Sequence, residues 1–240
     1  MNRPRIYISA AIALVVVVAV IVVIAITFKP GSATDRAATS STPTNPDQPL
    51  LLTLNDFPEG YTEDIPVSSS EAANQQQAEP WDGYRPDACR RAFNARAEQT
   101  ARTTRTGFVA KGPTAATPTY GQYLIHNNDD LEQMRATLLD PQCLTVTIDT
   151  HKTGIYTMQT SELASPAMPE GVHTLLVKYV TDITNAPANY ADHYEVINGF
   201  AWLPTGSVAY LSAEADGRGN SVDINQFNDL FAKAVKKASR

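Results

Sequence analysis

A long uncharged run near the start of the chain, Ile6–Phe28, limits what the N-terminal part can fold into. It reads IYISAAIALVVVVAVIVVIAITF, and Tyr7, Ser9 and Thr27 are its only polar breaks. As a helix it would extend about 35 Å, enough to cross a hydrocarbon core of about 30 Å. Cleaved signal peptides carry apolar regions of only about 7–15 residues. The run therefore predicts an uncleaved transmembrane helix.

The charges that flank this run predict its orientation. Arg3 and Arg5 precede it, and Lys29 follows it. Cytoplasmic flanks of membrane helices are enriched in Lys and Arg. We therefore expect a single-pass protein of the cell membrane, with residues 1–5 in the cytoplasm and the C-terminal part outside it.

The next stretch, 29–49, is rich in Pro, Ser and Thr and has no large apolar residue. Such a segment cannot bury enough surface to offset the entropy lost on ordering, so we expect a disordered linker. The rest of the chain, 50–240, is long enough for one domain with a sizeable core. It opens with the apolar stretch LLLTLNDF at 50–57.

Hydrophobic periodicity in 50–240 predicts an α+β fold: an antiparallel sheet of five to seven strands, flanked by about three helices. The expected helices lie at 86–100, 128–140 and 223–238, and Pro86 suits the first position of the first helix. For the second helix the pair Asp129 and Glu132 predicts the cap, and for the third the pair Asp223 and Gln226 does so. The expected strands lie at 106–111, 119–126, 143–150, 155–163, 171–184, 193–204 and 207–215.

Charge is distributed unevenly along a chain whose formal net charge is −6. The segment 85–111 has seven basic residues against two acidic ones. Its arginines either form a solvated helix face or present a surface to an anionic partner such as lipid, wall polymer or an acidic protein. The acidic balance of the whole domain argues against nucleic acid as a partner. The arginines of this candidate surface are Arg85, Arg90, Arg91, Arg96, Arg102 and Arg105.

The sequence contains none of the common signatures of hydrolases, zinc proteases, nucleotide-binding loops or dinucleotide folds. The stretch EADGRGNSVD at 214–223 resembles a calcium loop only superficially, since Arg218 stands where an oxygen ligand is needed. The four histidines are scattered without metal-ligand spacing. We therefore expect a protein that is not an enzyme and has no cofactor or metal. Candidate ligand-contacting aromatics are Trp81, Tyr84 and Trp202.

The chain has two cysteines, Cys89 and Cys143. They are too few for a zinc site and too far apart in sequence for a redox pair. In an oxidising compartment outside the cell, an even number of cysteines in one domain indicates a disulfide. Loop-closure entropy for this separation corresponds to roughly 4 kcal/mol of stabilisation.

Several segments of the chain resemble a known class of exported domains. They are LLTLNDFPEGY at 51–61, PDAC at 86–89 and DPQC at 140–143, followed by the strand series that ends in a helix after Asp223. Together they are similar to the exported domains of actinobacterial, mycobacterial-type envelope lipoproteins and sensor-like proteins, including the extracellular sensor domain of a mycobacterial receptor Ser/Thr kinase. The resemblance implies an antiparallel sheet with helices, a disulfide, and ligand binding or sensing in place of catalysis.

The chain departs from both relatives. No cysteine lies near the apolar run to carry a lipid, and only five residues precede that run, which leaves no room for a kinase domain there. We therefore expect a non-catalytic, membrane-anchored binding or sensor-like module of the cell envelope. Its expected ligand is a small hydrophobic molecule, an anionic lipid or a wall component. The alternatives are an assembly partner that docks an envelope protein through 85–111, and a hydrolase with an unrecognised site. A His–carboxylate–hydroxyl cluster would favour the last.

Overall fold

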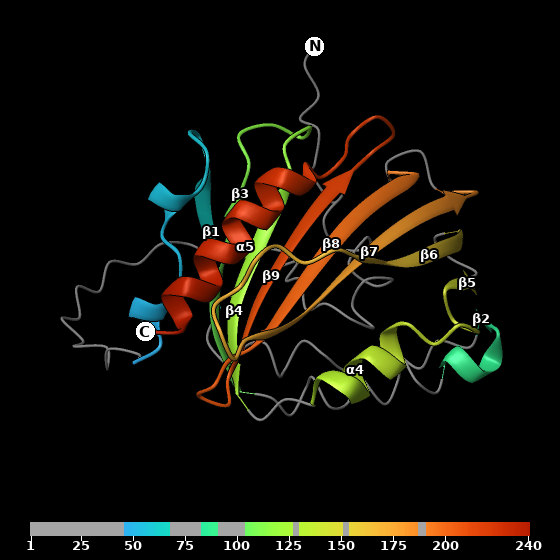
Figure 1. Ribbon diagram of the computed structural model, residues 1–240. Helices are drawn as coiled ribbons and strands as arrows, with labels where there is room; N and C mark the ends of the chain where they lie inside the picture. Colours follow the sequence, from blue (N-terminus) through green and yellow to red (C-terminus); the bar gives the residue numbers. More distant parts are fainter. Residues whose placement is uncertain (1–45, 68–82, 91–103, 127–129, 151–153, 187–190) are drawn as a thin grey trace, which may run out of the picture.

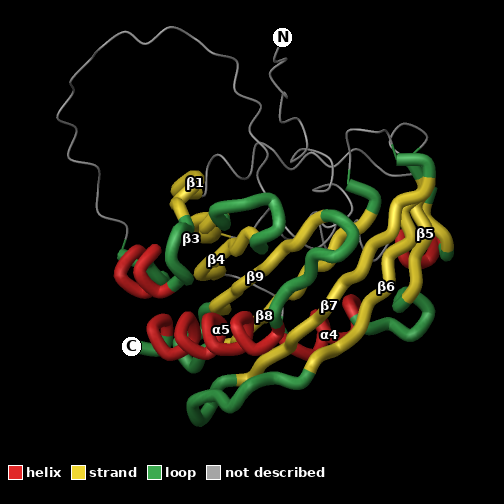
Figure 2. Tube along the Cα trace, turned by 90° about the horizontal axis from the view of Figure 1, so that it is seen from above, coloured by secondary structure: helices red, strands yellow, loops and turns green. Residues whose placement is uncertain are grey.

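A nine-stranded antiparallel sheet forms the centre of the computed structural model, which describes residues 46–67, 83–90, 104–126, 130–150, 154–186 and 191–240 (Figure 1). The strand order is β1-β3-β4-β9-β8-β7-β6-β5-β2, and Figure 2 shows the strands following one another across the sheet. The strands are β1 (Thr62–Val67), β2 (Tyr84–Arg85), β3 (Thr104–Lys111), β4 (Thr119–His126), β5 (Thr145–Asp149), β6 (Ile155–Leu163), β7 (His173–Thr184), β8 (His193–Trp202) and β9 (Val208–Asp216).

The α+β class and the antiparallel sheet are as the sequence predicts, but the strand count is not. All seven predicted strands are present and adjacent in the sheet, and β1 and β2 add one strand at each edge. Sequence patterns are weak at both edges. β1 contains Pro66, which cannot donate to a ladder, and its pairing with β3 is irregular between Glu63 and Pro66. β2 is only two residues long.

Within the described ranges, the helices α4 and α5 pack against the sheet. α5 (Ile224–Ala238) begins at Asp223, whose side chain accepts hydrogen bonds from the backbone N–H groups of Asn225 and Gln226. Of its predicted apolar stripe, Ile224 lies outside the core and is 36% exposed. α4 (Leu131–Leu138) is capped by Asp130, which accepts from the N–H of Gln133 at 2.8 Å. The capping residue is therefore Asp130 and not the predicted Asp129, because the helix begins one residue later than expected.

Other predicted segments lie partly or wholly outside the described residues. Residues 87–90 are helical, and the remainder of the helix expected at 86–100 lies outside the described part of the chain. The same holds for the predicted transmembrane helix at 6–28 and for most of the linker at 29–49. Among the helices that the structure does describe, none is long and apolar enough to span a bilayer.

Alternation along the strands divides the core between the two faces of the sheet. On β9, Ala209 and Leu211 belong to the cluster under α5, whereas Val208 and Tyr210 belong to the cluster on the opposite side. We call the first the α5 face, because Phe227, Leu230, Phe231, Ala234 and Val235 of α5 complete its core. Figure 1 shows α5 crossing in front of β4 and β9. We call the second the tyrosine face. Its cluster includes Met134 and Leu138 of α4 together with Tyr84, Tyr123, Tyr156, Tyr179, Tyr194 and Tyr210.

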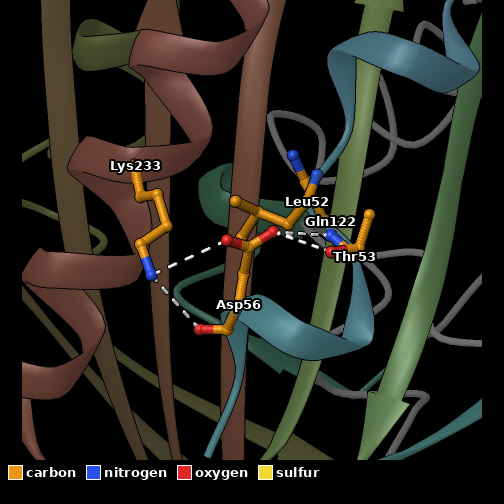
Figure 3. Close-up of polar contacts among 5 residues, drawn as sticks. All are labelled: Leu52, Thr53, Asp56, Gln122 and Lys233. Atoms are coloured by element: carbon orange, nitrogen blue, oxygen red, sulfur yellow. Dashed lines mark hydrogen bonds and ion pairs between the residues drawn. The ribbon is translucent and has the colours of Figure 1, made fainter.

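An N-terminal arm, residues 46–61, closes the α5 face. It contains two short 3-10 turns, η1 (Gln48–Leu50) and η2 (Leu54–Asp56), and buries Leu51, Leu52 and Phe57. Figure 3 shows how polar contacts hold the arm. The N–H of Leu52 donates to Gln122 Oε1 of β4 at 2.7 Å. Lys233 Nζ of α5 lies 3.5 Å from the carbonyl oxygen of Asp56.

Candidate functional site

The disulfide between Cys89 and Cys143 is present, with the two Cα atoms 5.6 Å apart. Cys89 lies in the helical turn 87–90, and Cys143 precedes β5. Both residues are almost fully buried in the core of the tyrosine face, at 0% and 3% exposure. The bond therefore fastens a short helical segment onto one end of the sheet, and neither sulfur is available for chemistry.

The described arginines of the 85–111 segment do not form one surface. Arg85 is exposed on β2, at one edge of the sheet, and Arg90 pairs with Asp87 at 3.1 Å. Arg105 lies on β3, near the opposite edge, and only 6% of it is exposed. Arg91, Arg96 and Arg102 lie outside the described residues.

The candidate aromatics are not grouped either. Tyr84 is buried in the core of the tyrosine face at 5% exposure. Trp202 is partly buried and packs beside Phe200, with ring centroids 6.1 Å apart. Trp81 lies outside the described residues. The aromatic side chain that shapes a site is instead Tyr123 of β4.

Tyr123 lies flat against the sheet over two glycines on neighbouring strand positions. A Cβ on Gly107 of β3 would come 2.5 Å from its ring, and a Cβ on Gly121 of β4 would come 3.3 Å from it. At Gly107 a Cβ would also come 2.0 Å from the carbonyl oxygen of Gln122, and at Gly121 it would come 2.8 Å from Oγ of Ser212. Both positions therefore exclude a side chain and leave room for the ring. This accounts for glycines inside two strands where they otherwise weaken β-structure.

Arg105 supports the same ring from one side. Its guanidinium carbon lies 5.8 Å from the centroid of the Tyr123 ring, within the range of a cation–π contact. Burial lowers the pKa of Arg105, and the nearby hydroxyls of Tyr123 and Tyr210 act in the opposite direction. Among the described residues no carboxylate pairs with this guanidinium.

Beyond the ring, away from Arg105 along β4, the tyrosine face has a small hollow. Its volume is about 10 Å³, which is room for about one water molecule. Gly121 lies at its base, and Val109 and Val196 supply apolar surface. The residues that line this hollow are Val109, Thr119, Gly121, Tyr123, Val196, Ser212 and Glu214.

The hydroxyl of Tyr123 is buried at the hollow without a hydrogen-bond partner in the described structure. It lies 3.8 Å from where a Cβ on Gly121 would be. A neighbouring hydroxyl, that of Ser212, is occupied, because it donates to the carbonyl oxygen of Gly121 at 3.3 Å. The amide nitrogen of Asn198, on the strand beside Ser212, is also buried without a partner. Unpaired buried polar groups cost free energy, and in native proteins most are hydrogen-bonded.

Glu214 of β9 supplies the ionisable group of the hollow. Burial raises the pKa of its carboxyl from the ordinary 4.5 to about 7, and the negative charge of Asp216 adds to the effect. Within the described ranges no cation pairs with this carboxyl. At neutral pH the carboxyl is thus divided between its charged and neutral forms, and a hydrogen-bond donor or a cation placed in the hollow would favour the charged form.

The histidines do not converge on the hollow. His173 is exposed, and His193, the first residue of β8, lies 2.9 Å from Asp182 of β7. His126 lies on the α5 face, where Nε2 is 2.9 Å from Asp47. The described residues hold no group of three or more side chains arranged to bind a metal ion.

The sequence-based interpretation did not single out Tyr123, Ser212 or Glu214. A signal for Glu214 was present, because it is the only charged residue in the apolar run VAYLSAEA of β9. Strict alternation from Tyr210 through Ser212 to Glu214 would also have placed the three on one face. The unpaired Tyr123 hydroxyl has no such signal, since it depends on the side chains opposite it.

Comparisons with protein-family models, curated proteins and solved structures found no match for this chain.

Proposed function

We propose that the domain is a membrane-tethered binding module of the cell envelope, which takes a small amine- or hydroxyl-bearing group into the hollow of the tyrosine face. One observation carries this proposal: Tyr123, whose buried hydroxyl has no partner among the described residues, and Glu214, whose carboxyl pairs with no described cation, line the same hollow. The membrane tether and the envelope location are the expectations from the apolar run and its flanking charges.

A primary ammonium group fits these surroundings better than an anion. The carboxyl of Glu214 is the ionisable side chain of the hollow, and the carboxyl of Asp216 adds to the negative potential there. An ammonium would donate one hydrogen bond to Glu214 and another to the lone pairs of the Tyr123 oxygen. It would also stabilise the charged carboxylate, and so lower the pKa of Glu214 and release a proton on binding.

The small volume limits what enters. About 10 Å³ holds a group the size of one water molecule, so a terminal ammonium or hydroxyl can enter while the carbon next to it stays at the mouth. The valines at 109 and 196 can contact that carbon, and the remainder of a larger ligand would lie over the surface of the sheet. The ligand is therefore expected to be a larger molecule with a terminal amine, recognised by its end.

Three isosteric probes test this proposal: propylammonium, propanol and propionate, added to the full chain purified in a mild detergent. Saturation-transfer NMR should show saturable binding of propylammonium, weaker binding of propanol and none of propionate. Because only the charged form of Glu214 attracts a cation strongly, the affinity for propylammonium should fall roughly eightfold between pH 7.5 and pH 6.

Two glutamine variants provide the matched comparison. Glu214→Gln should weaken propylammonium binding at least about tenfold and remove its pH dependence. Glu59→Gln, which changes an exposed glutamate on the N-terminal arm, should leave both unchanged. Equal binding of all three probes, or unchanged binding in Glu214→Gln, would contradict the proposal. Mass spectrometry of small molecules that co-purify with the wild type but not with Glu214→Gln would identify the ligand.

A further inference from the structure

Three polar side chains from distant parts of the chain meet on the α5 face, at the end of β4. Nε2 of His126 lies 2.9 Å from Oδ2 of Asp47, and Nδ1 of the same ring lies 3.0 Å from Oγ of Ser207. The hydroxyl of Thr106 also donates to Oδ2 of Asp47, at 3.3 Å. The imidazole therefore stands between a carboxylate and a hydroxyl, within hydrogen-bond distance of both.

Two paired strands and the N-terminal arm bring these residues together. His126 is the last residue of β4, and Ser207 precedes β9, the strand that pairs with β4. Alternation places both side chains on the α5 face, with Leu124 and Ala209 as their neighbours two positions away. Asp47 comes from the N-terminal arm, which is docked onto this face through the contacts of Leu52.

The hydrogen bonds select one tautomer of the neutral imidazole. An ionised Asp47 can only accept, so Nε2 of His126 carries the ring proton and donates it to that carboxylate. Nδ1 then holds a lone pair and accepts from the hydroxyl of Ser207. In this arrangement the carboxylate of Asp47 orients His126, and His126 acts as the base that activates the hydroxyl of Ser207 as a nucleophile.

The side chain of His126 is accessible to small reagents. It is 35% exposed, whereas that of Asp47 is 20% exposed and Ser207 is 9% exposed. Ser207 follows Gly206 at the tip of the β8–β9 hairpin. Gly206 has a φ of +84°, and no heavy atom lies within 4 Å of the position that a Cβ would take there. The hairpin tip is therefore open at the residue that precedes Ser207.

We infer that Ser207 is a nucleophile activated by His126, and that this cluster hydrolyses small carboxylic esters. Ser207 Oγ forms a bond to the ester carbonyl carbon while its proton moves to Nδ1 of His126. The carbon–oxygen bond to the alcohol breaks, and the alcohol leaves with the proton from His126. Water, deprotonated by the same nitrogen, then attacks the acyl-serine, releasing the carboxylic acid and restoring Ser207.

This activity is independent of the proposed ligand site, which lies on the opposite face of the sheet. It departs from the sequence-based expectation of a domain without catalysis. No signature around Ser207 could have indicated it, because LPTGSVA lacks the flanking glycine pattern of a nucleophile elbow.

The test uses a fluorophosphonate probe on the full chain in mild detergent. The probe carries its own good leaving group, so its reaction reports mainly on the nucleophile and its base. Peptide mass spectrometry should locate a covalent adduct on Ser207. Ser207→Ala should abolish that adduct, and His126→Gln and Asp47→Asn should each slow labelling at least about 100-fold. Ser161→Ala, which removes an exposed hydroxyl on β6, should label at the wild-type rate.

The first test is whether the probe labels Ser207 in the wild-type protein. Absence of an adduct on Ser207 after prolonged exposure to the probe would overturn the inference. So would labelling of Ser207 at an unchanged rate in a His126→Gln protein whose circular dichroism and disulfide match those of the wild type. Hydrolysis of p-nitrophenyl acetate gives the second readout: it should be saturable in wild type and fall to the buffer rate in Ser207→Ala.

Discussion

The two faces of the sheet differ in the partners that they give to a glutamate side chain. On the α5 face, Glu195 accepts a hydrogen bond from the N–H of Val222 at 3.1 Å and pairs with Lys178 at 2.7 Å. On the tyrosine face, Glu214 has neither kind of partner among the described residues. The two residues lie on adjacent strands, so the difference comes from what covers each face.

The same contrast extends to other polar groups. Gln122 on the α5 face accepts a hydrogen bond from the arm. Tyr123, the next residue, has a hydroxyl that is buried on the other face and has no partner in the described part of the chain. The α5 face holds a comparable hydroxyl, that of Tyr120, but its ring is enclosed by those of Phe57 and Tyr61. Unpaired buried polar groups are uncommon in native proteins, and a function, local strain or a bound water accounts for most of them. The α5 face therefore provides stability over most of its area, and the tyrosine face provides the candidate ligand site.

The largest expected effect lies in the core of the α5 face. Phe231→Ala should lower the free energy of unfolding by about 3–5 kcal/mol, because Phe231 is fully buried and the smaller side chain would leave a cavity over Gly199. Urea denaturation monitored by circular dichroism measures the change. A loss below about 1 kcal/mol would mean that α5 contributes little to the packing of its face.

The tyrosine face should depend on its covalent bond. Replacing Cys89 and Cys143 together by Ser should lower the free energy of unfolding by roughly 2–4 kcal/mol, because the unfolded chain regains the freedom of a loop of this length. The comparison is with the wild type under identical oxidising conditions. Equal stability of the two proteins would show that the apolar contacts of the tyrosine face are sufficient without the disulfide.

The stability of the protein should depend on pH through Glu214. The folded protein holds the proton of Glu214 up to about pH 7, whereas an unfolded chain releases it near 4.5. Stability should therefore decrease as pH rises from about 4.5 through 7, and then level off. Glu214→Gln should remove much of this decrease and stabilise the protein at pH 8 by on the order of 1 kcal/mol, after allowance for partial exposure.

Glu195→Gln is the counterpart on the α5 face. It should destabilise the protein at pH 8, because it breaks the pair with Lys178. Thermal denaturation at pH 5, 6, 7 and 8 checks both variants. A stabilising Glu195→Gln together with a neutral Glu214→Gln would reverse the proposed difference between the faces.

The smallest expected effects on the free energy of unfolding concern Tyr123 and Tyr210 of the tyrosine face. Tyr123→Phe should raise the free energy of unfolding by up to about 1 kcal/mol, because it removes a buried hydroxyl that has no partner. Tyr210→Phe should lower it by about 1 kcal/mol, because the Tyr210 hydroxyl donates to Asn198 Oδ1 at 2.9 Å. Chemical denaturation of both variants, in parallel with the wild type, measures the pair. Similar losses in both would indicate that the Tyr123 hydroxyl is satisfied in solution.

The sequence predicted the fold better than the site, for a physical reason. Alternation and capping are local, so the seven central strands, the position of α5 and the cap at Asp223 followed from neighbouring residues. β1 and β2 did not, because an edge strand needs only one partner and can be short or contain proline. The disulfide followed from a count of two cysteines. The hollow and the Asp47–His126–Ser207 cluster did not follow, because each joins residues from strands or segments far apart in sequence.

The strand order also has a consequence for how the chain folds. β5 to β9 pair in sequence order, whereas the β3–β4 hairpin pairs with β9, across about ninety intervening residues. Pairing over such a separation is slow, because loop-closure entropy is lost before the contact forms. During synthesis, one edge of the β3–β4 hairpin stays unpaired until β9 has been made. The arm likewise lacks its packing partner until α5 has been made. A C-terminal truncation before β9 should therefore separate the β3–β4 hairpin from the strands β5 to β8, because β9 joins them in the sheet.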